Sequence, residues 1–200
     1  MQKNGLTPTY YIIILLGYVV MMSVYAIFLR DNIKERNYTR IFGSILILYG
    51  YALLVYEYSE EWKIAINEEK HDDIDYTYAK GGAIDQKEAT RMFQSVELDL
   101  IAKQFFKGRL VLIIFHTLSF ILPINEHVKM TDITAILGQM MVYTNNYLIF
   151  GYILLLAYYV LYFIRNYKDA NKYFVNKLQV VGSSMLIYHY LKNISYMLTL

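Results

Sequence analysis

Twenty consecutive residues without a formal charge, Tyr10–Leu29, constrain the fold of this chain more than any other stretch. At a rise of about 1.5 Å per residue, a helix of that length matches the roughly 30 Å hydrocarbon core of a bilayer. The run is too long for the core of a signal peptide, and no small-residue cleavage pattern follows it. We therefore expect a retained transmembrane helix at the start of the protein.

Further apolar stretches predict an all-α polytopic membrane protein with about five spans. The loop Arg30–Arg40 is long enough only to turn the chain back, so the first two spans form a hairpin. Gly43 and Gly50 in the second span, seven residues apart, favour close approach of another backbone. The predicted spans are Tyr10–Leu29, Ile41–Tyr58, Phe105–Ile124, Tyr147–Ile164 and Leu178–Leu200, and Thr131–Tyr143 is predicted as a re-entrant or interfacial helix.

The positive-inside rule favours an alternative with six crossings. With five spans, the basic loops Arg30–Arg40 and Arg165–Lys177 fall on opposite faces of the membrane. The rule places such loops on one face. A true hairpin within Met130–Arg165 would add the missing crossing.

The polar middle of the chain carries most of its acid, because twelve of the seventeen Asp and Glu residues fall between Glu57 and Asp99. From Lys87 onward, apolar residues recur at the spacing of an amphipathic helix. We therefore divide the chain into a transmembrane hairpin (1–58), an acidic extramembrane segment with that helix (59–104) and a C-terminal transmembrane bundle (105–200).

Composition excludes several classes of function. Charged residues make up 18% of the chain, against about a quarter in soluble domains. The net charge is only +2 and no Lys/Arg-rich block is present, which argues against nucleic acid as a partner. The absence of cysteine removes disulfides, thiolate catalysis and Fe–S clusters. No Gly-rich phosphate loop, HExxH pair or serine nucleophile elbow is present, so we expect no catalytic residues of its own.

A stripe of five polar side chains shares one face of the last predicted helix. An ionisable residue at membrane depth commonly faces a bundle interior or a water-filled cavity, which indicates a proton- or quinone-associated site beside His189. The competing interpretation is that this helix packs on a neighbouring subunit, with its lysine reaching the interface or pairing with a carboxylate such as Glu57. The polar stripe comprises Ser184, Tyr188, Lys192, Ser195 and Thr199.

Two histidines, His116 and His189, lie in the middle of different predicted spans. Two imidazoles at similar depth on separate helices are what bis-histidine ligation of haem b needs. Against this, each helix carries a single histidine, which can simply donate a hydrogen bond to a backbone carbonyl.

Two other patterns have simpler interpretations. The acidic patch from His71 to Asp75 lacks the Gly and distant Glu of an EF-hand loop, so we expect a solvated docking segment and no metal site. The 22 tyrosines could suggest a redox relay, but we interpret them as interfacial belts near span ends and as replacements for Phe elsewhere.

The usage of Tyr, Ile, Lys and Asn, together with no Cys and two Pro, is that of AT-rich codons. In composition the chain resembles divergent inner-membrane subunits encoded in the mitochondrial DNA of protists, ciliates in particular. The resemblance implies a structural or accessory subunit of a respiratory-chain complex or of ATP synthase, with other membrane subunits and phospholipids as partners. The alternatives are a cytochrome b-like haem anchor and a small ion- or proton-conducting membrane protein.

Overall fold

The computed structural model describes residues 7–71, 107–122, 124, 129–144 and 147–199, and all its regular elements are helices. The predicted amphipathic helix beginning at Lys87, and the aspartates of the acidic patch, lie outside these residues. The expectation of an all-helical chain is confirmed for the part described.

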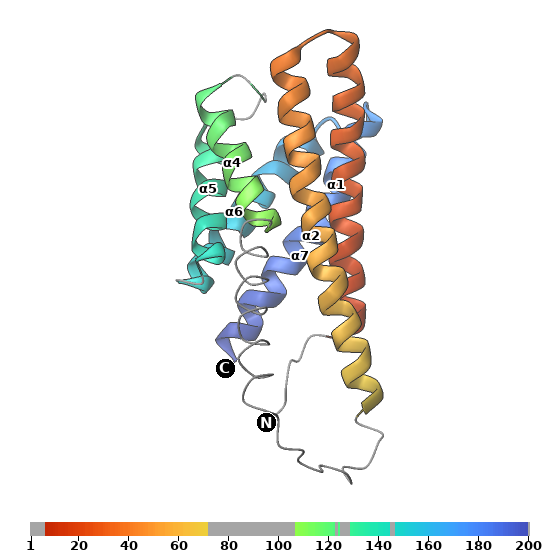
Figure 1. Ribbon diagram of the computed structural model, residues 1–200, viewed down its shortest axis with the longest axis vertical. Helices are drawn as coiled ribbons and strands as arrows, with labels where there is room; N and C mark the ends of the chain where they lie inside the picture. The colour runs from red at the N-terminus through yellow and green to blue at the C-terminus, as the bar shows by residue number, and fades with distance from the viewer. Residues whose placement is uncertain (1–6, 72–106, 123, 125–128, 145–146, 200) are drawn as a thin grey trace, which may run out of the picture.

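The first two helices form the predicted hairpin (Figure 1). Helix α1 spans Pro8–Lys34 and α2 spans Tyr38–His71. Between them Arg36 adopts a positive φ of 54°. The side chain of Asn37 then accepts a hydrogen bond from the backbone N–H of Arg40 at 3.2 Å, as an N-cap asparagine does.

Helix α2 continues well beyond the predicted end of the second span at Tyr58. Its 34 residues correspond to about 51 Å at 1.5 Å per residue. The lower part of α2 extends beyond the other helices in Figure 1. The boundary predicted between residues 58 and 59 falls inside this continuous helix, which carries the first acidic residues of the middle segment. The division into domains stays a prediction.

The second half of the chain contributes four helices whose bounds lie within a few residues of those predicted. The third predicted span begins later and ends earlier than expected, since α4 is only 14 residues long and the backbone becomes extended at Leu122. The four helices are α4 (Gly108–Ile121), α5 (Lys129–Tyr143), α6 (Leu148–Tyr167) and α7 (Phe174–Leu198).

The helices pack in chain order as a closed ring, because each contacts the next and α7 packs back on α1. Helix α5 is a full member of this ring, between α4 and α6. Residues beside both basic loops, such as Arg40 and Arg165, line one cavity. The two basic loops thus lie at the same end of the bundle, as the alternative with six crossings requires. The number of crossings itself remains a prediction.

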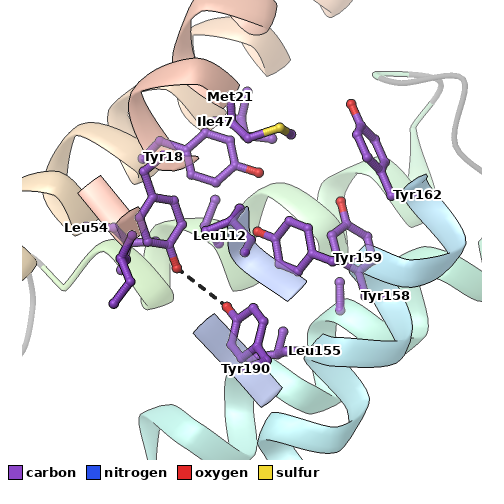
Figure 2. Packing of buried hydrophobic residues seen from close by; sticks show 14 of the residues in the cluster. Tyr18, Met21, Ile47, Leu54, Leu112, Leu155, Tyr158, Tyr159, Tyr162 and Tyr190 are labelled. Carbon is purple, nitrogen blue, oxygen red and sulfur yellow. Dashed lines mark hydrogen bonds between the residues drawn. The ribbon is translucent and has the colours of Figure 1, made fainter. Parts of the chain in front are cut away.

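Three helical segments are long and apolar enough to cross a membrane: Pro8–Lys34, Tyr38–Lys63 and Leu148–Tyr167. Helix α4 is apolar but shorter. Inside the ring, buried tyrosines from α1, α2, α6 and α7 pack with aliphatic side chains (Figure 2). The largest fully buried side chains include Tyr18, Tyr51, Tyr159 and Tyr190.

Tyrosine is thus a major component of the core, and our interpretation of the tyrosines as interfacial belts and simple Phe replacements is wrong for these positions. The hydroxyls of Tyr18 and Tyr190 lie 3.5 Å apart between the neighbouring helices α1 and α7 (Figure 2). The rings of Tyr159 and Tyr190 stack at 5.5 Å between centroids. A phenol supplies both apolar area and a hydroxyl that can find a partner inside the bundle.

Candidate functional site

His189 lies at the centre of a buried polar network near the start of α1. Its Nδ1 atom is 2.7 Å from the hydroxyl of Tyr10 on α1, and its Nε2 atom is 3.1 Å from the hydroxyl of Tyr58 on α2. The imidazole is 1% exposed. Both ring nitrogens of His189 are therefore occupied by phenol hydroxyls from two other helices.

Arg109, the second residue of α4, extends the network to two more helices. Its guanidinium donates one hydrogen bond to the Tyr58 hydroxyl at 2.8 Å and another to the Gln139 carbonyl oxygen on α5 at 3.1 Å. The planar fork of arginine suits two such acceptors in fixed directions. On the other side of His189, the amide of Asn193 donates to the Tyr10 hydroxyl at 2.6 Å.

The network thus joins five of the six described helices at one end of the ring. We call it the His189 network, and it comprises Tyr10, Tyr58, Arg109, Gln139, His189 and Asn193.

The His189 network has two consistent arrangements of hydrogens, because a neutral imidazole carries one N–H. In the first, Tyr10 donates to Nδ1 and Nε2–H donates to Tyr58. In the second, Tyr58 donates to Nε2 and Nδ1–H donates to Tyr10. In either arrangement Arg109 and Asn193 donate to the two phenol oxygens. The arrangement can hold a proton on either side of His189 without moving a heavy atom.

Glu57 supports the network by capping the N-terminus of α4, the helix that carries Arg109. No side chain of α4 itself caps its first turn. The carboxylate of Glu57 on α2 accepts a hydrogen bond from the backbone N–H of Gly108 at 2.7 Å. A negative charge at this position also complements the helix dipole. We had considered Glu57 as a partner for Lys192, but its carboxylate is hydrogen-bonded to the backbone of α4.

The second predicted histidine lies in a separate polar pair. Nδ1 of His116 is 2.9 Å from a carboxylate oxygen of Asp132 on α5, and both side chains are 2% exposed. The rings of Phe115 and Tyr158 pack edge-on against the imidazole. Asp132 was missed by our reading of the sequence, although an acidic residue in the first turn of an apolar helix was the available signal.

The structure thus gives His116 and His189 different partners. Haem ligation by the pair would require the Tyr10 or Tyr58 hydrogen bond to His189 to break, so that a nitrogen becomes available to iron. The haem alternative stays a prediction. Among the described residues, no group of three or more His, Cys, Asp or Glu side chains could hold a metal ion.

The polar stripe on α7 faces away from the His189 network. All five of its side chains are exposed, whereas His189 and Asn193 on the adjacent face are buried. The hydroxyl of Ser184 donates to the carbonyl of Val180 at 2.7 Å. Our expectation that the stripe lines an interior is therefore not met among the described residues, and packing of the stripe against another subunit stays a prediction.

Comparisons with known proteins give no family for the chain: no protein-family model, no curated protein and no solved structure matches it. The functional argument therefore rests on its own residues.

Proposed function

We propose that this chain is a non-catalytic structural subunit of a larger membrane assembly, which packs against neighbouring subunits and positions them. The observation that carries the proposal is the outward-facing polar stripe on α7. Tyr188 and Lys192 in this stripe are exposed and form no hydrogen bond with any described residue. A protein partner covering α7 would supply the hydrogen bonds that lipid hydrocarbon cannot.

Helix α7 is not among the candidate membrane spans, and the support from membrane energetics applies if it lies in the bilayer beside them. A lysine near the centre of a bilayer costs a few kcal/mol, although a long side chain near a helix end can reach the interface. Polar contacts between transmembrane helices contribute about 0.6 to 2 kcal/mol each. Contact with a second protein is therefore the more favourable environment for the exposed face of α7.

The apolar outer surface of the candidate spans also requires contact with lipid or with another protein. Only 33%, 39% and 28% of the most apolar windows of α1, α2 and α6 are buried inside the chain. Large apolar side chains therefore face outward, where lipid or other subunits must surround them.

The finer part of the proposal is the location and the kind of assembly. We assign the chain to the mitochondrial inner membrane, and to a respiratory-chain complex or ATP synthase. The support is compositional: AT-rich residue usage with 22 Tyr and no Cys, as in divergent mitochondrially encoded subunits of protists.

A matched pair of crosslinking positions tests the subunit proposal. The photoreactive residue p-benzoylphenylalanine replaces either Tyr188 on α7, 42% exposed, or Ile114 on α4, 44% exposed. Helix α4 is separated from α7 by two helices in either direction around the ring. In native membranes we expect position 188 to give a protein adduct of one defined mass. Position 114 should give no adduct of that mass.

Native-gel electrophoresis of the same membranes provides the second readout. After mild solubilisation the chain should migrate in a band far above its own 23.6 kDa plus detergent. Migration of the folded chain alone, together with no adduct at position 188, would contradict the proposal. A large band that lacks respiratory-chain and ATP synthase subunits would contradict only its finer part.

A second candidate function, proton transfer, is favoured by the two hydrogen arrangements of the His189 network. Conversion of the first into the second passes the Tyr10 hydroxyl proton to Nδ1 and the Nε2 proton to the Tyr58 oxygen, along the two existing hydrogen bonds. The step balances when Tyr10 takes up a proton from water and the original hydroxyl proton of Tyr58 leaves to water, so that one proton is carried through the network. The test is pH-gradient decay in liposomes containing the purified chain. His189→Phe should abolish a flux that His116→Phe preserves, and equal flux in both variants would reject this candidate.

A further inference from the structure

A cavity of about 330 Å³ lies at the end of the bundle opposite the His189 network. It opens where α1 ends, α2 begins, α6 ends and α7 begins, so it lies at the level of the two basic loops. Its volume falls at the lower end of the range for small-ligand sites. If the helices span a bilayer, this level is where lipid head groups lie.

Among the described residues, charged side chains of both signs line the cavity. Asp31 near the end of α1 and Glu35, its C-cap residue, contribute two carboxylates, and Oδ1 of Asp31 also accepts a hydrogen bond from Nε of Arg30 at 3.0 Å. Arg40 from α2 and Arg165 from α6 contribute two guanidiniums. All four are partly or fully exposed, as residues around an opening would be.

The deeper wall of the cavity is buried and combines amide and aromatic groups. Asn166 and Gln179 are 9% and 6% exposed, and Gln179 donates to the Tyr162 hydroxyl at 2.6 Å. Tyr25 and Phe115 supply apolar area beside them. A ligand would therefore place its charged groups at the opening and its less polar part against this wall.

We propose that this cavity binds a zwitterion that carries a phosphate and an ammonium group, the chemistry of a phosphoethanolamine head group. Guanidinium groups bind phosphate oxygens through paired charge-assisted hydrogen bonds. The carboxylates of Asp31 and Glu35 accept hydrogen bonds from the ammonium. An anion alone would also face the carboxylates and a cation alone the guanidiniums, whereas a ligand that carries both charges can contact the two kinds of side chain at once.

The inference rests on the membrane location within the proposed function and is independent of any partner subunit. Two sources offer this chemistry, a phosphatidylethanolamine lipid and soluble O-phosphoethanolamine. Because the cavity lies at the helix ends, we assign the lipid as the ligand.

The test uses the purified, delipidated full chain in detergent and measures ligand-induced shifts of its thermal unfolding temperature. The probes are dihexanoyl phosphatidylethanolamine, dihexanoyl phosphatidylglycerol, which has no ammonium group, and O-phosphoethanolamine. We expect saturable stabilisation by the ethanolamine lipid at concentrations at which the glycerol lipid has little effect. Equal stabilisation by the two lipids would overturn the proposal.

Single substitutions test the carboxylates and the guanidiniums of the site separately. Glu35→Gln should reduce the preference for the ethanolamine lipid about tenfold, the effect of losing one hydrogen bond to a charged group. Arg40→Gln should weaken binding of both lipids. Lys168→Gln, a change of the same kind at a residue of the same loop region that does not line the cavity, should leave both unchanged. A preference unaltered in Glu35→Gln would refute the assigned role of the carboxylates.

The soluble probe identifies the source of the ligand. Binding of O-phosphoethanolamine as tight as that of the lipid would overturn the assignment to a lipid. Tighter binding of the lipid, together with ethanolamine lipid recovered by mass spectrometry from gently purified protein, would support it. Because only the isolated chain is used, a failure here leaves the crosslinking test of the subunit proposal intact.

Discussion

The hydroxyl of Tyr58 lies 3.1 Å from Nε2 of His189, although 131 positions separate the two residues in the chain. The same hydroxyl accepts a hydrogen bond from Arg109. One phenol oxygen therefore connects α2, α4 and α7. Loss of this oxygen should affect both neighbours at once, because a buried donor or acceptor without a partner is costly.

Tyr58→Phe should lower the free energy of unfolding by about 1–3 kcal/mol, since it leaves groups on His189 and Arg109 unpaired. Tyr56→Phe is the matched control, because Tyr56 lies on the same helix and is 65% exposed. Unfolding in mixed detergent micelles can be followed by the fluorescence of Trp62, the single tryptophan. Equal stability of the two variants would show that the network contributes nothing.

Arg109→Lys should destabilise the protein although the charge is kept. A lysine ammonium lacks the planar fork that reaches Gln139 and Tyr58 together. Arg30→Lys is the control, because the Arg30 side chain is 63% exposed and its ion-pair partner among the described residues is its partly exposed neighbour Asp31. We expect the free energy of unfolding to fall by about 1–3 kcal/mol for Arg109→Lys, and by less than about 0.5 kcal/mol for Arg30→Lys. Similar values for both would refute the role of the fork.

The His116 and Asp132 pair should show strong coupling in a double-mutant cycle. Asp132→Leu alone removes the partner of a buried imidazole, and His116→Leu alone leaves a buried carboxylate, so each should cost about 3 kcal/mol or more. The double variant should be closer to the wild type than either single variant, because no unpaired polar group remains. Additive losses in the same unfolding assay would contradict this expectation.

Gly108→Ala should be poorly tolerated, because a Cβ atom there would lie 2.7 Å from the backbone oxygen of Gly50 and 2.8 Å from the backbone nitrogen of Leu54. Backbone atoms cannot move aside without shifting α2 against α4. At Gly50 the three atoms nearest to a new Cβ atom all belong to the side chains of Leu112 and Val111, which can adjust. We expect Gly108→Ala to cost about 1–3 kcal/mol and Gly50→Ala less. The reverse order would contradict the observed helix contact.

The positions of the helices could be predicted from the sequence because helix formation depends on local residues. The apolar run at Tyr10–Leu29 lies within α1, and the stretch predicted as the last span, Leu178–Leu200, overlaps α7, although α7 is not among the candidate membrane spans. The glycine spacing of Gly43 and Gly50 correctly indicated close packing, since a Cβ atom at Gly50 would meet α4. Local composition could not show that the partner helix there is α4.

The sequence did not show which face of each helix is buried. The buried faces determine which residues form the candidate site. Polar periodicity on α7 indicated an interior stripe around Lys192, yet the buried face carries His189 and Asn193. A signal for the tyrosine core was present in the seven-residue spacing of Tyr11, Tyr18 and Tyr25. That spacing indicates a tyrosine core only once it is known that neighbouring helices place their own tyrosines against it.

The sequence by itself determined that this protein is helical and strongly apolar. It predicted about five spans, whereas three of the described helices are long and apolar enough to cross a membrane. Only the tertiary structure decided which side chains meet inside. The physical reason is that α1 and residues 41–56 of α2 are apolar nearly all round, so their sequences carry little information about the direction each face takes. Closure of the ring by α7 packing on α1 sets that direction, and with it brings His189 between Tyr10 and Tyr58.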